Sequence, residues 1–256
     1  MDPRSVLAQF DQEMRARPDL YGEDRVESVG GVVRVVGEHS WIAYSRLDSS
    51  SARSAIRDQT DYFRGLAKRV EWKLFGHDQP SNLGELLRAE GYLPDPPETL
   101  VALDLTDHPA FGDSPAEVEV RRVRDPADLS AAVAVSEEAF GPGEGWSGTD
   151  FAHRLSDPTF GLFLAFVAGR AVSAGRLEMP LGRAFASLWG GGTSPGFRGR
   201  GIYRALVRAR VEVARSRGFR YLTVDALPTS RPILERVGFV PLTSMTGWVF
   251  DPSIAR

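Results

Sequence analysis

The most informative segment of the sequence is Thr193-Ser194-Pro195-Gly196-Phe197-Arg198-Gly199-Arg200-Gly201-Ile202-Tyr203-Arg204-Ala205-Leu206-Val207. A β-rich run ends at Thr193, a loop with three glycines follows, and a helical pattern begins at Ile202. At such a junction, unpaired backbone N–H groups and the positive end of the helix dipole face one point, which favours an anion such as phosphate. Gly199 and Gly201 carry no Cβ that would keep phosphate oxygens away from the backbone.

Positive charge is concentrated at this junction. Between Phe197 and Arg220 there are eight arginines and one acid, Glu212, so the local formal charge is 8 − 1 = +7. The whole chain has a net charge of -3, and its general preference for arginine over lysine is most simply a property of a GC-rich genome. No lysine follows the second glycine, and the glycine spacing is not Gly-x-Gly-x-x-Gly. These two differences exclude a Walker A loop and a dinucleotide-binding loop.

The composition narrows the class of protein. With 256 residues, 42% hydrophobic and 25% charged, the chain can bury a sizeable core. Zero cysteines exclude disulfide scaffolds, thiolate zinc sites and cysteine nucleophiles. We find no apolar run of membrane length and no signal peptide, and we expect a cytoplasmic protein that binds neither membrane nor nucleic acid. The four histidines lack metal-ligand spacing, so we predict no metal.

The order of expected elements divides the chain in two at a linker over residues 106–115. The first half is predicted to have a leading helix followed by a β-β-α-β-α-β order, and the second half a strand, two helices, three strands, a long helix, a strand, a short helix and end strands. The expected helices cover residues 2–17, 52–68, 82–90, 125–140, 149–155, 202–217 and 230–237. The expected strands cover residues 31–37, 41–47, 70–75, 99–105, 118–120, 160–168, 171–179, 183–193, 221–226 and 239–250.

The two halves repeat a short pattern. Residues 87–94 (LRAEGYLP) match residues 234–241 (LERVGFVP) in type, at an offset of 238 − 91 = 147. Carried back by this offset, Arg198-Gly199-Arg200-Gly201 falls on Ser51-Ala52-Arg53-Ser54. If the repeat is real, the first half kept the helices and lost the glycines; coincidence between two helix ends is the alternative.

These motifs resemble those of the GNAT superfamily of acyl-CoA N-acyltransferases. The signature of that superfamily is Arg/Gln-x-x-Gly-x-Gly/Ala between a strand and a long helix, and Arg198 and Gly201 match it. Pro195 and the pair Gly238-Phe239 match two further features that are common in the superfamily. The resemblance covers residues 116–250, and more weakly residues 27–105 through the repeat.

The resemblance implies an α/β fold of two GNAT-like modules, each a mixed, mainly antiparallel sheet flanked by helices. Residues 1–110 would be a degenerate copy without a cofactor loop, and residues 116–256 an acetyl-CoA-binding domain. The implied activity is transfer of an acetyl group from acetyl-CoA to a primary amine in a ternary complex. The implied cofactor-binding residues are Gly192 and Thr193 for the pantetheine arm, then Arg198, Gly199, Arg200, Gly201, Ile202 and Tyr203 for the pyrophosphate, with Ser230 as a further contact.

Two residues depart from the pattern of the superfamily. The last Gly/Ala of the signature is Tyr203, whose side chain either crowds the cofactor or turns along the helix flank. The tyrosine that the superfamily often has four residues before the Gly-Phe pair, proposed to protonate the leaving thiolate, is Leu234. Solvent or another hydroxyl must then supply that proton.

Acyl transfer to an amine also needs a base, and a carboxylate is the usual group. The sequence offers Glu137, Glu138, Glu144, Glu178 and Asp225, of which we favour Glu138 and Asp225; surface or capping roles are the alternative for each. Trp146, in a glycine-rich loop, is predicted to line the acceptor pocket, with a partly buried anchor as the alternative.

The acceptor is predicted to be a small-molecule or peptide amine, and a homodimer is possible. A catalytically silent acyl-CoA-binding module is the alternative function, and a longer acyl or an aminoacyl donor is a further alternative.

Overall fold

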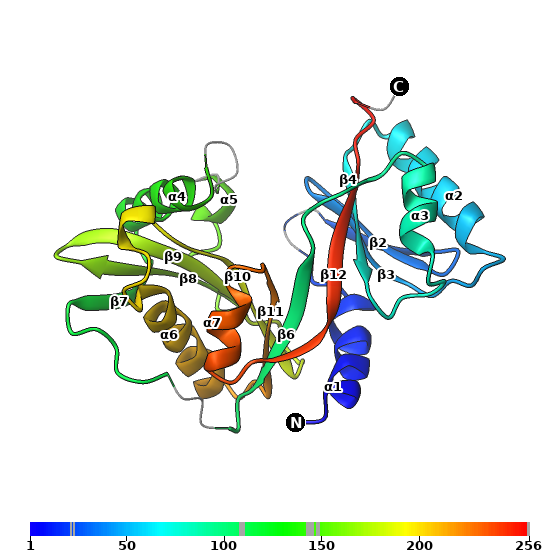
Figure 1. The fold of residues 1–256 in the computed structure, drawn as a ribbon. Helices are drawn as coiled ribbons and strands as arrows, with labels where there is room; N and C mark the ends of the chain where they lie inside the picture. The colour runs from blue at the N-terminus through cyan, green and yellow to red at the C-terminus, as the bar shows by residue number, and fades with distance from the viewer. Residues whose placement is uncertain (21, 23, 108–110, 142–145, 147–148, 255–256) are drawn as a thin grey trace. The chain divides into compact units, whose positions relative to one another are not determined.

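Residues from both ends of the chain meet in the first of the two units of the computed structural model. Unit 1 contains Met1–Val101, Asp225–Arg231 and Pro241–Arg256, and unit 2 contains Ala102–Val224 and Pro232–Val240 (Figure 1). The structure describes every residue except 21, 23, 108–110, 142–145, 147–148 and 255–256.

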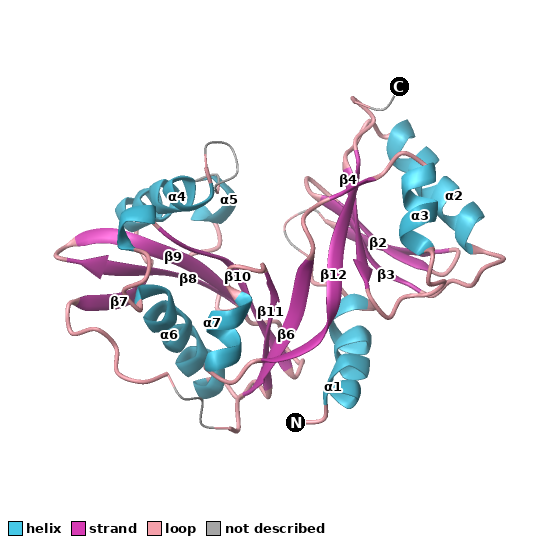
Figure 2. Ribbon diagram, viewed as in Figure 1, coloured by secondary structure: helices cyan, strands magenta, loops and turns pink. Residues whose placement is uncertain are grey.

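The chain contains both helices and strands, with runs of consecutive strands such as β1 to β3 and β8 to β10 (Figure 2). The helices are α1 (Pro3–Phe10), α2 (Ala52–Gly65), α3 (Leu83–Ala89), α4 (Pro126–Phe140), α5 (Thr149–Ala152), α6 (Ile202–Ser216) and α7 (Arg231–Arg236), with a π-helical turn at Asp11–Arg15 and a 3-10 turn at Pro195–Phe197. The strands are β1 (Arg25–Val29), β2 (Val32–Val36), β3 (Ser40–Ser45), β4 (Val70–Phe75), β5 (Leu93–Pro94), β6 (Glu98–Asp104), β7 (Val118–Arg122), β8 (Phe160–Val167), β9 (Arg170–Glu178), β10 (Phe185–Thr193), β11 (Tyr221–Ala226) and β12 (Val240–Phe250).

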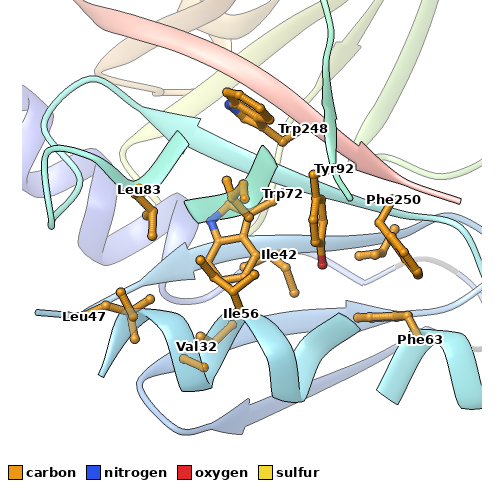
Figure 3. Close-up of a cluster of buried hydrophobic side chains, with 14 of the residues drawn as sticks. Val32, Ile42, Leu47, Ile56, Phe63, Trp72, Leu83, Tyr92, Trp248 and Phe250 are labelled. Carbon is orange, nitrogen blue, oxygen red and sulfur yellow. The ribbon is translucent and has the colours of Figure 1, made fainter. Parts of the chain in front are cut away.

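In unit 1, helices α2 and α3 cover a sheet built from β1 to β4 and β12. The β1–β2 and β2–β3 pairs are antiparallel, β3 runs parallel to β4, and β12 pairs antiparallel with β4. Trp72 of β4 is fully buried and points toward Ile56 of α2, and its ring meets Tyr92 edge-on at 6.3 Å (Figure 3). Burial of such large apolar side chains stabilises the unit by about 2 kcal/mol each.

In unit 2, helices α4 and α6 lie on opposite faces of a second set of strands (Figure 1). Strands β7, β8, β9 and β10 pair antiparallel in that order, and β11 pairs parallel with β10. The C-terminal part of β6 lies beside β11, where Leu105 N–H donates to Arg220 O. The sheet is therefore mixed and mainly antiparallel, which confirms the fold class predicted from the sequence.

The boundary between the units differs from a simple division at residues 106–115. Strand β12 belongs to unit 1 because six of its residues, Met245–Phe250, pair with Phe75–Val70 of β4. Strand β6 contributes Glu98–Val101 to unit 1 and its last three residues to unit 2. Pairing between residues so distant in the sequence leaves no local signal.

The predicted repeat has matching local structure in the two units. Gly91 and Gly238 both have positive φ, of 91° and 101°. The residue after each glycine donates its N–H to the carbonyl oxygen five residues earlier, Tyr92 to Leu87 O and Phe239 to Leu234 O, both at 3.1 Å. In addition, β3–α2–β4 and β10–α6–β11 each join a parallel strand pair through a helix. These features support the repeat, while common descent of the units stays a prediction.

Local signals placed most elements within a few residues of their observed bounds. The two Asp-Pro pairs begin helices as predicted: Asp2 accepts from the N–H groups of Arg4 and Ser5, and Asp125 accepts from Asp128 N–H. Strand β1 was not predicted, because Val26 and Val29 are exposed and its residues do not alternate between apolar and polar. In the part of the chain that the structure describes, no helix is both long and apolar enough to span a membrane.

Candidate functional site

The glycine loop forms the predicted strand–loop–helix junction in unit 2. Gly199 and Gly201 both have φ of +77°, a left-handed conformation that side chains rarely adopt, and open space surrounds Gly199. Gly201 is the N-cap of α6 and provides no side-chain hydrogen bond to the helix. The first N–H groups of an α-helix have no acceptor within the helix, so this end offers donors to an anion.

Arg198 shapes the loop with its side chain. Its Nε donates to Thr193 O at 3.0 Å, and its Nη2 donates to Ala139 O at 2.9 Å. The guanidinium therefore ties the loop to the end of β10 and the end of α4. The side chain of Ile202 is 2% exposed and packs in an apolar cluster, which leaves its backbone as the part able to meet a ligand. Arg200 is exposed, with its guanidinium 5.2 Å from the ring centre of Phe197.

One edge of β10 is open along its second half. The described pairs between β10 and β11 end at Ser187 and Thr223. On the other edge, Ser194 N–H donates to Val172 O of β9 at 2.9 Å. Because N–H groups alternate along a strand, the N–H of Thr193 faces the open edge. An extended chain with its own amides could pair with this edge, as an added strand would.

A β-bulge interrupts the pairing of β10 with β9 between Trp189 and Gly192. Gly192 lies at the end of this bulge, and its carbonyl accepts the Ser173 hydroxyl at 2.7 Å. The same hydroxyl lies 2.8 Å from the hydroxyl of Thr193. Ser173 therefore holds the end of β10 in place, a role that nothing in the local sequence indicated.

Each of the three consecutive glycines of β10 has a side chain packed on it. A Cβ on Gly190 would lie 2.6 Å from the indole of Trp146, and a Cβ on Gly192 would lie 2.7 Å from Ala139. Trp146 also meets Phe151 edge-on at 5.5 Å. These contacts make Trp146 a partly buried anchor on the α4 face of the bulge, and its role in acceptor binding stays a prediction.

Tyr203 lies on the other face of the bulge. A Cβ on Gly191 would lie 3.0 Å from Tyr203 Cε2 and 3.6 Å from its hydroxyl oxygen. The side chain of Tyr203 therefore packs on the sheet, and whether it also crowds the cofactor stays a prediction. Leu234 is fully buried, so the position of the expected tyrosine is part of the core.

The predicted carboxylates have different surroundings. Glu138 is exposed on α4 and forms an ion pair with Arg170 at 3.2 Å. Glu178 is buried in a two-point pair with Arg154, at 3.1 and 2.8 Å, so its oxygens already hold a cation. Glu137 is exposed, and Glu144 lies outside the described residues.

Asp225 belongs to an acidic cluster in unit 1, which also contains Glu98, Glu71 and Asp95. It stands on β11 two residues after Thr223, and its Oδ1 is buried without a hydrogen-bond partner among the described residues. Burial raises the pKa of Asp225, and nearby Lys73 opposes this shift. Burial, followed by the charge of Asp225, raises the pKa of Glu98 to about 7. Glu98 was not among the predicted residues, because its partner Asp225 lies more than a hundred residues away in the sequence.

Ser230 has a local role in the structure. Its hydroxyl donates to Leu227 O at 3.2 Å in the turn just before α7. Among the described residues, no group of three or more His, Asp or Glu side chains is arranged to hold a metal ion.

Comparison with known proteins agrees with this geometry. Residues 130–239 match the model of the acetyltransferase (GNAT) family. A search of curated protein sequences gives no match.

The most informative comparisons are with solved structures. A GCN5-related N-acetyltransferase from Kribbella flavida superposes with a TM-score of 0.68 at 15% identity, covering 96% of this chain and 93% of that chain. One from Sphaerobacter thermophilus gives 0.62 at 16% identity, covering 97% and 85%. A tandem GNAT protein from the clavulanic acid biosynthesis pathway gives 0.62 at 14% identity, covering 88% and 79%.

At these identities the structural matches establish the fold, and the family-model match concerns residues 130–239 alone. The glycine junction and the open edge of β10 both lie within the matched residues. Residues 130–239 are therefore similar to the GNAT acetyltransferase family, and the chain has the fold of GNAT proteins.

Proposed function

We propose that unit 2 binds acetyl-CoA and that the protein transfers the acetyl group directly to a primary amine. The observation that carries this proposal is the open edge of β10, which leads straight into a glycine loop and the uncapped start of α6. The first feature suits an extended arm with amide groups, and the second suits a pyrophosphate. Because they are consecutive in the chain, one ligand with both parts would engage both.

The residues present fit such a ligand. Backbone N–H groups from Gly199 to Tyr203 would hold the pyrophosphate, with the exposed Arg200 as a counter-charge. The open edge of β10 near Gly192 and Thr193 would pair with the pantetheine arm, and Ser230 is a further proposed contact. Bound acetyl-CoA would supply an activated acyl group, and the protein would supply orientation and proton transfer.

A base must remove a proton from the acceptor amine. Asp225 and its neighbour Glu98 suit this role, because burial raises the pKa of both carboxyls, that of Glu98 to about 7, and a carboxyl with a pKa near 7 can both accept and return a proton at neutral pH. Glu138 is the less favoured proposal, because its exposed ion pair with Arg170 leaves it in ordinary surface surroundings. In the reaction a C–N bond forms, the C–S bond breaks, and one proton passes from nitrogen to sulfur overall.

The acceptor is proposed to be a small-molecule or peptide amine, since an acidic cluster attracts the ammonium form before deprotonation. The donor is proposed to be acetyl-CoA rather than a longer acyl or an aminoacyl donor. A cytoplasmic location, a homodimer and the absence of nucleic-acid and membrane partners stay predictions from the sequence.

A catalytically silent module is the second proposed function. It is favoured by the leucine at position 234, which cannot donate the proton that a tyrosine at this position would supply. The two functions share the cofactor site and differ in turnover.

Thiol release separates them. The protein is incubated with acetyl-CoA and a panel of amines and peptides, and free CoA is followed with a thiol reagent. Amine-dependent release supports the transferase, and CoA binding without release supports the silent module. Calorimetry with the double variant Arg198→Ala and Gly201→Glu tests the site itself, and unchanged CoA affinity in that variant would refute it.

A further inference from the structure

Arg210 of α6 is a buried charge with incomplete pairing. Its exposed fraction is 0%, and it donates from Nε to Leu206 O and from Nη1 to Arg176 O, both at 3.2 Å. Its Nη2 has no hydrogen-bond partner among the described residues, and no ion pair of Arg210 is found there. Burial lowers the pKa of Arg210 to about 10, while attraction to Tyr203 opposes this shift. An arrangement of this kind destabilises a fold.

The unpartnered nitrogen points at the bulge of β10. A Cβ on Gly191 would lie 3.3 Å from Arg210 Nη2 and 3.6 Å from the hydroxyl oxygen of Tyr203. A Cβ on Gly175, in β9, would lie 2.6 Å from Arg210 Nη1. Tyr203 and Arg210 are seven residues apart, two turns along one face of α6. The glycines of two strands thus make room for a guanidinium and a phenol at one point.

This point belongs to the segment where the edge of β10 is open. Pairing with β11 ends at Ser187, and the bulge follows between Trp189 and Gly192. A hydroxyl at Gly191 therefore stands within one residue of the backbone that would hold the donor. The position that the superfamily often uses for a proton donor is occupied by the buried Leu234.

We propose that Tyr203 gives its proton to the departing thiolate and that Arg210 is a positioning residue whose buried charge favours the phenolate. This inference rests on the proposed function. As the C–S bond breaks, the sulfur takes the phenolic proton and the thiol leaves. The proton that the amine nitrogen loses to the proposed base, Asp225 with Glu98, then returns to the phenolate, which restores Tyr203.

Two physical arguments support this pair. A phenol ordinarily has a pKa near 10 and a thiol near 8.5, so a neighbouring cation that favours the phenolate brings donor and acceptor closer to a match. In addition, Arg210 has no counter-ion in the described chain that would explain its burial by structure alone. Side chains that destabilise the folded state are characteristic of functional sites.

The test uses three variants of the full chain. Tyr203→Phe removes the hydroxyl, Arg210→Met removes the buried charge, and Arg208→Met is the matched control. Arg208 lies on the same helix but forms an ion pair with Glu212 at 2.9 Å in a more exposed position. Because a buried charge without a counter-ion is replaced by an apolar chain, Arg210→Met should fold with a melting temperature equal to or above that of the wild type.

The kinetic readout is the dependence on the leaving group. We expect Tyr203→Phe to lower kcat by about 100-fold while KM for acetyl-CoA stays within about threefold. With a thioester donor whose leaving thiol is more acidic, the loss should shrink to about tenfold, because protonation matters less. Arg210→Met should lower kcat by about tenfold and move the alkaline limb of the pH profile upward. A purely structural role would not produce this leaving-group dependence.

A second readout needs no donor. Ultraviolet titration of tyrosinate should show one tyrosine that ionises at a lower pH in the wild type than in Arg210→Met, with the signal lost in Tyr203→Phe. Unchanged kcat in Tyr203→Phe, or a titration that Arg210→Met leaves unaltered, would overturn the inference. If the wild type transfers acetyl to no amine, the proposed function fails, and the titration still decides whether the pair exists.

Discussion

The starts of α6 and α2 perform the same local task in opposite ways. At α6 the backbone bends through Gly199 and Gly201, and no side chain caps the helix. At α2 the carboxylate of Asp48 accepts from the N–H groups of Ser50 and Ser51, each at 2.9 Å. These hydrogen bonds, with those from the two serine hydroxyls, lower the pKa of Asp48 to about 2. The N-cap of α2, Ser51, likewise makes no side-chain hydrogen bond to its helix, but the turn before α2 contains the carboxylate of Asp48, whereas the loop before α6 contains no acid.

The difference also appears in the register. By the offset of 147, Ile202 corresponds to residue 55, yet α2 begins at Ala52, three residues earlier. The loop of unit 1 is shorter and closed by its own side chains.

The largest expected effect comes from placing a carboxylate at the start of α6. Gly201→Glu adds a like charge where the pyrophosphate is proposed to bind, and CoA affinity should fall by about 100-fold, or about 3 kcal/mol. Isothermal calorimetry of the wild type should give one CoA per chain. Gly182→Glu is the control, because Gly182 also has positive φ (69°) and open surroundings. Binding of two CoA molecules per chain would contradict the proposal that only unit 2 binds CoA.

The second-largest expected effect is on the pH dependence of stability, and it comes from Glu98 in unit 1. The pKa of Glu98 is raised to about 7, so between pH 4.5 and 7 the folded state binds more protons than the unfolded state. Stability should therefore fall as pH rises through this window, by about 1 to 2 kcal/mol after allowance for partial exposure. In Glu98→Gln this fall should disappear. Urea unfolding from pH 4 to 8 checks this expectation, with the exposed Glu117→Gln as the control. If stability changes with pH equally in the wild type and in Glu98→Gln, Glu98 is not part of the proposed base.

A smaller effect separates backbone strain from ligand binding. Gly199→Ala and Gly182→Ala each place a methyl at positive φ in open space, so both should lower stability by about 1 kcal/mol. Only Gly199→Ala should weaken CoA binding, by about tenfold, because its methyl would meet the phosphate. Thermal denaturation and calorimetry of the two variants give the comparison. Equal CoA affinities would show that the backbone near Gly199 does not hold the ligand.

The smallest effect is expected at α2. In Asp48→Ala the N–H groups of Ser50 and Ser51 lose their acceptor, and the melting temperature should fall slightly near pH 7. Since the folded pKa of Asp48 is depressed, its contribution is present above pH 4 and is lost as pH falls toward 2. Melting curves of the wild type and variant should therefore converge at low pH. Asp58→Ala, an exposed acid on the same helix, serves as control, and failure to converge would contradict the role of Asp48.

Features that depend on local chemistry could be predicted from the sequence. Gly199 and Gly201 marked a junction that only glycine forms readily, and the Asp-Pro pairs marked two helix starts. The surroundings of a residue could not be predicted where its partners are distant in the sequence. Glu178 looked like a free carboxylate until its pairing with Arg154 was seen.

Arg210 illustrates the same limit. In the sequence it is one of eight arginines in a basic stretch, with nothing to separate it from Arg208. Position on the helix face toward the sheet buries one and exposes the other, and that face is known only when α6 is packed on β9 and β10.

The sequence by itself determined the strand–glycine loop–helix junction, the helix caps and the order of most elements. These depend on backbone conformation and hydrogen bonds within a few residues. Only the tertiary structure decided that β12 joins unit 1, that Asp225 lies near Glu98, and that Tyr203 and Arg210 meet at Gly191. Burial and pairing between distant segments set these features, because the free energy of a charge depends on neighbours that the chain brings together only on folding.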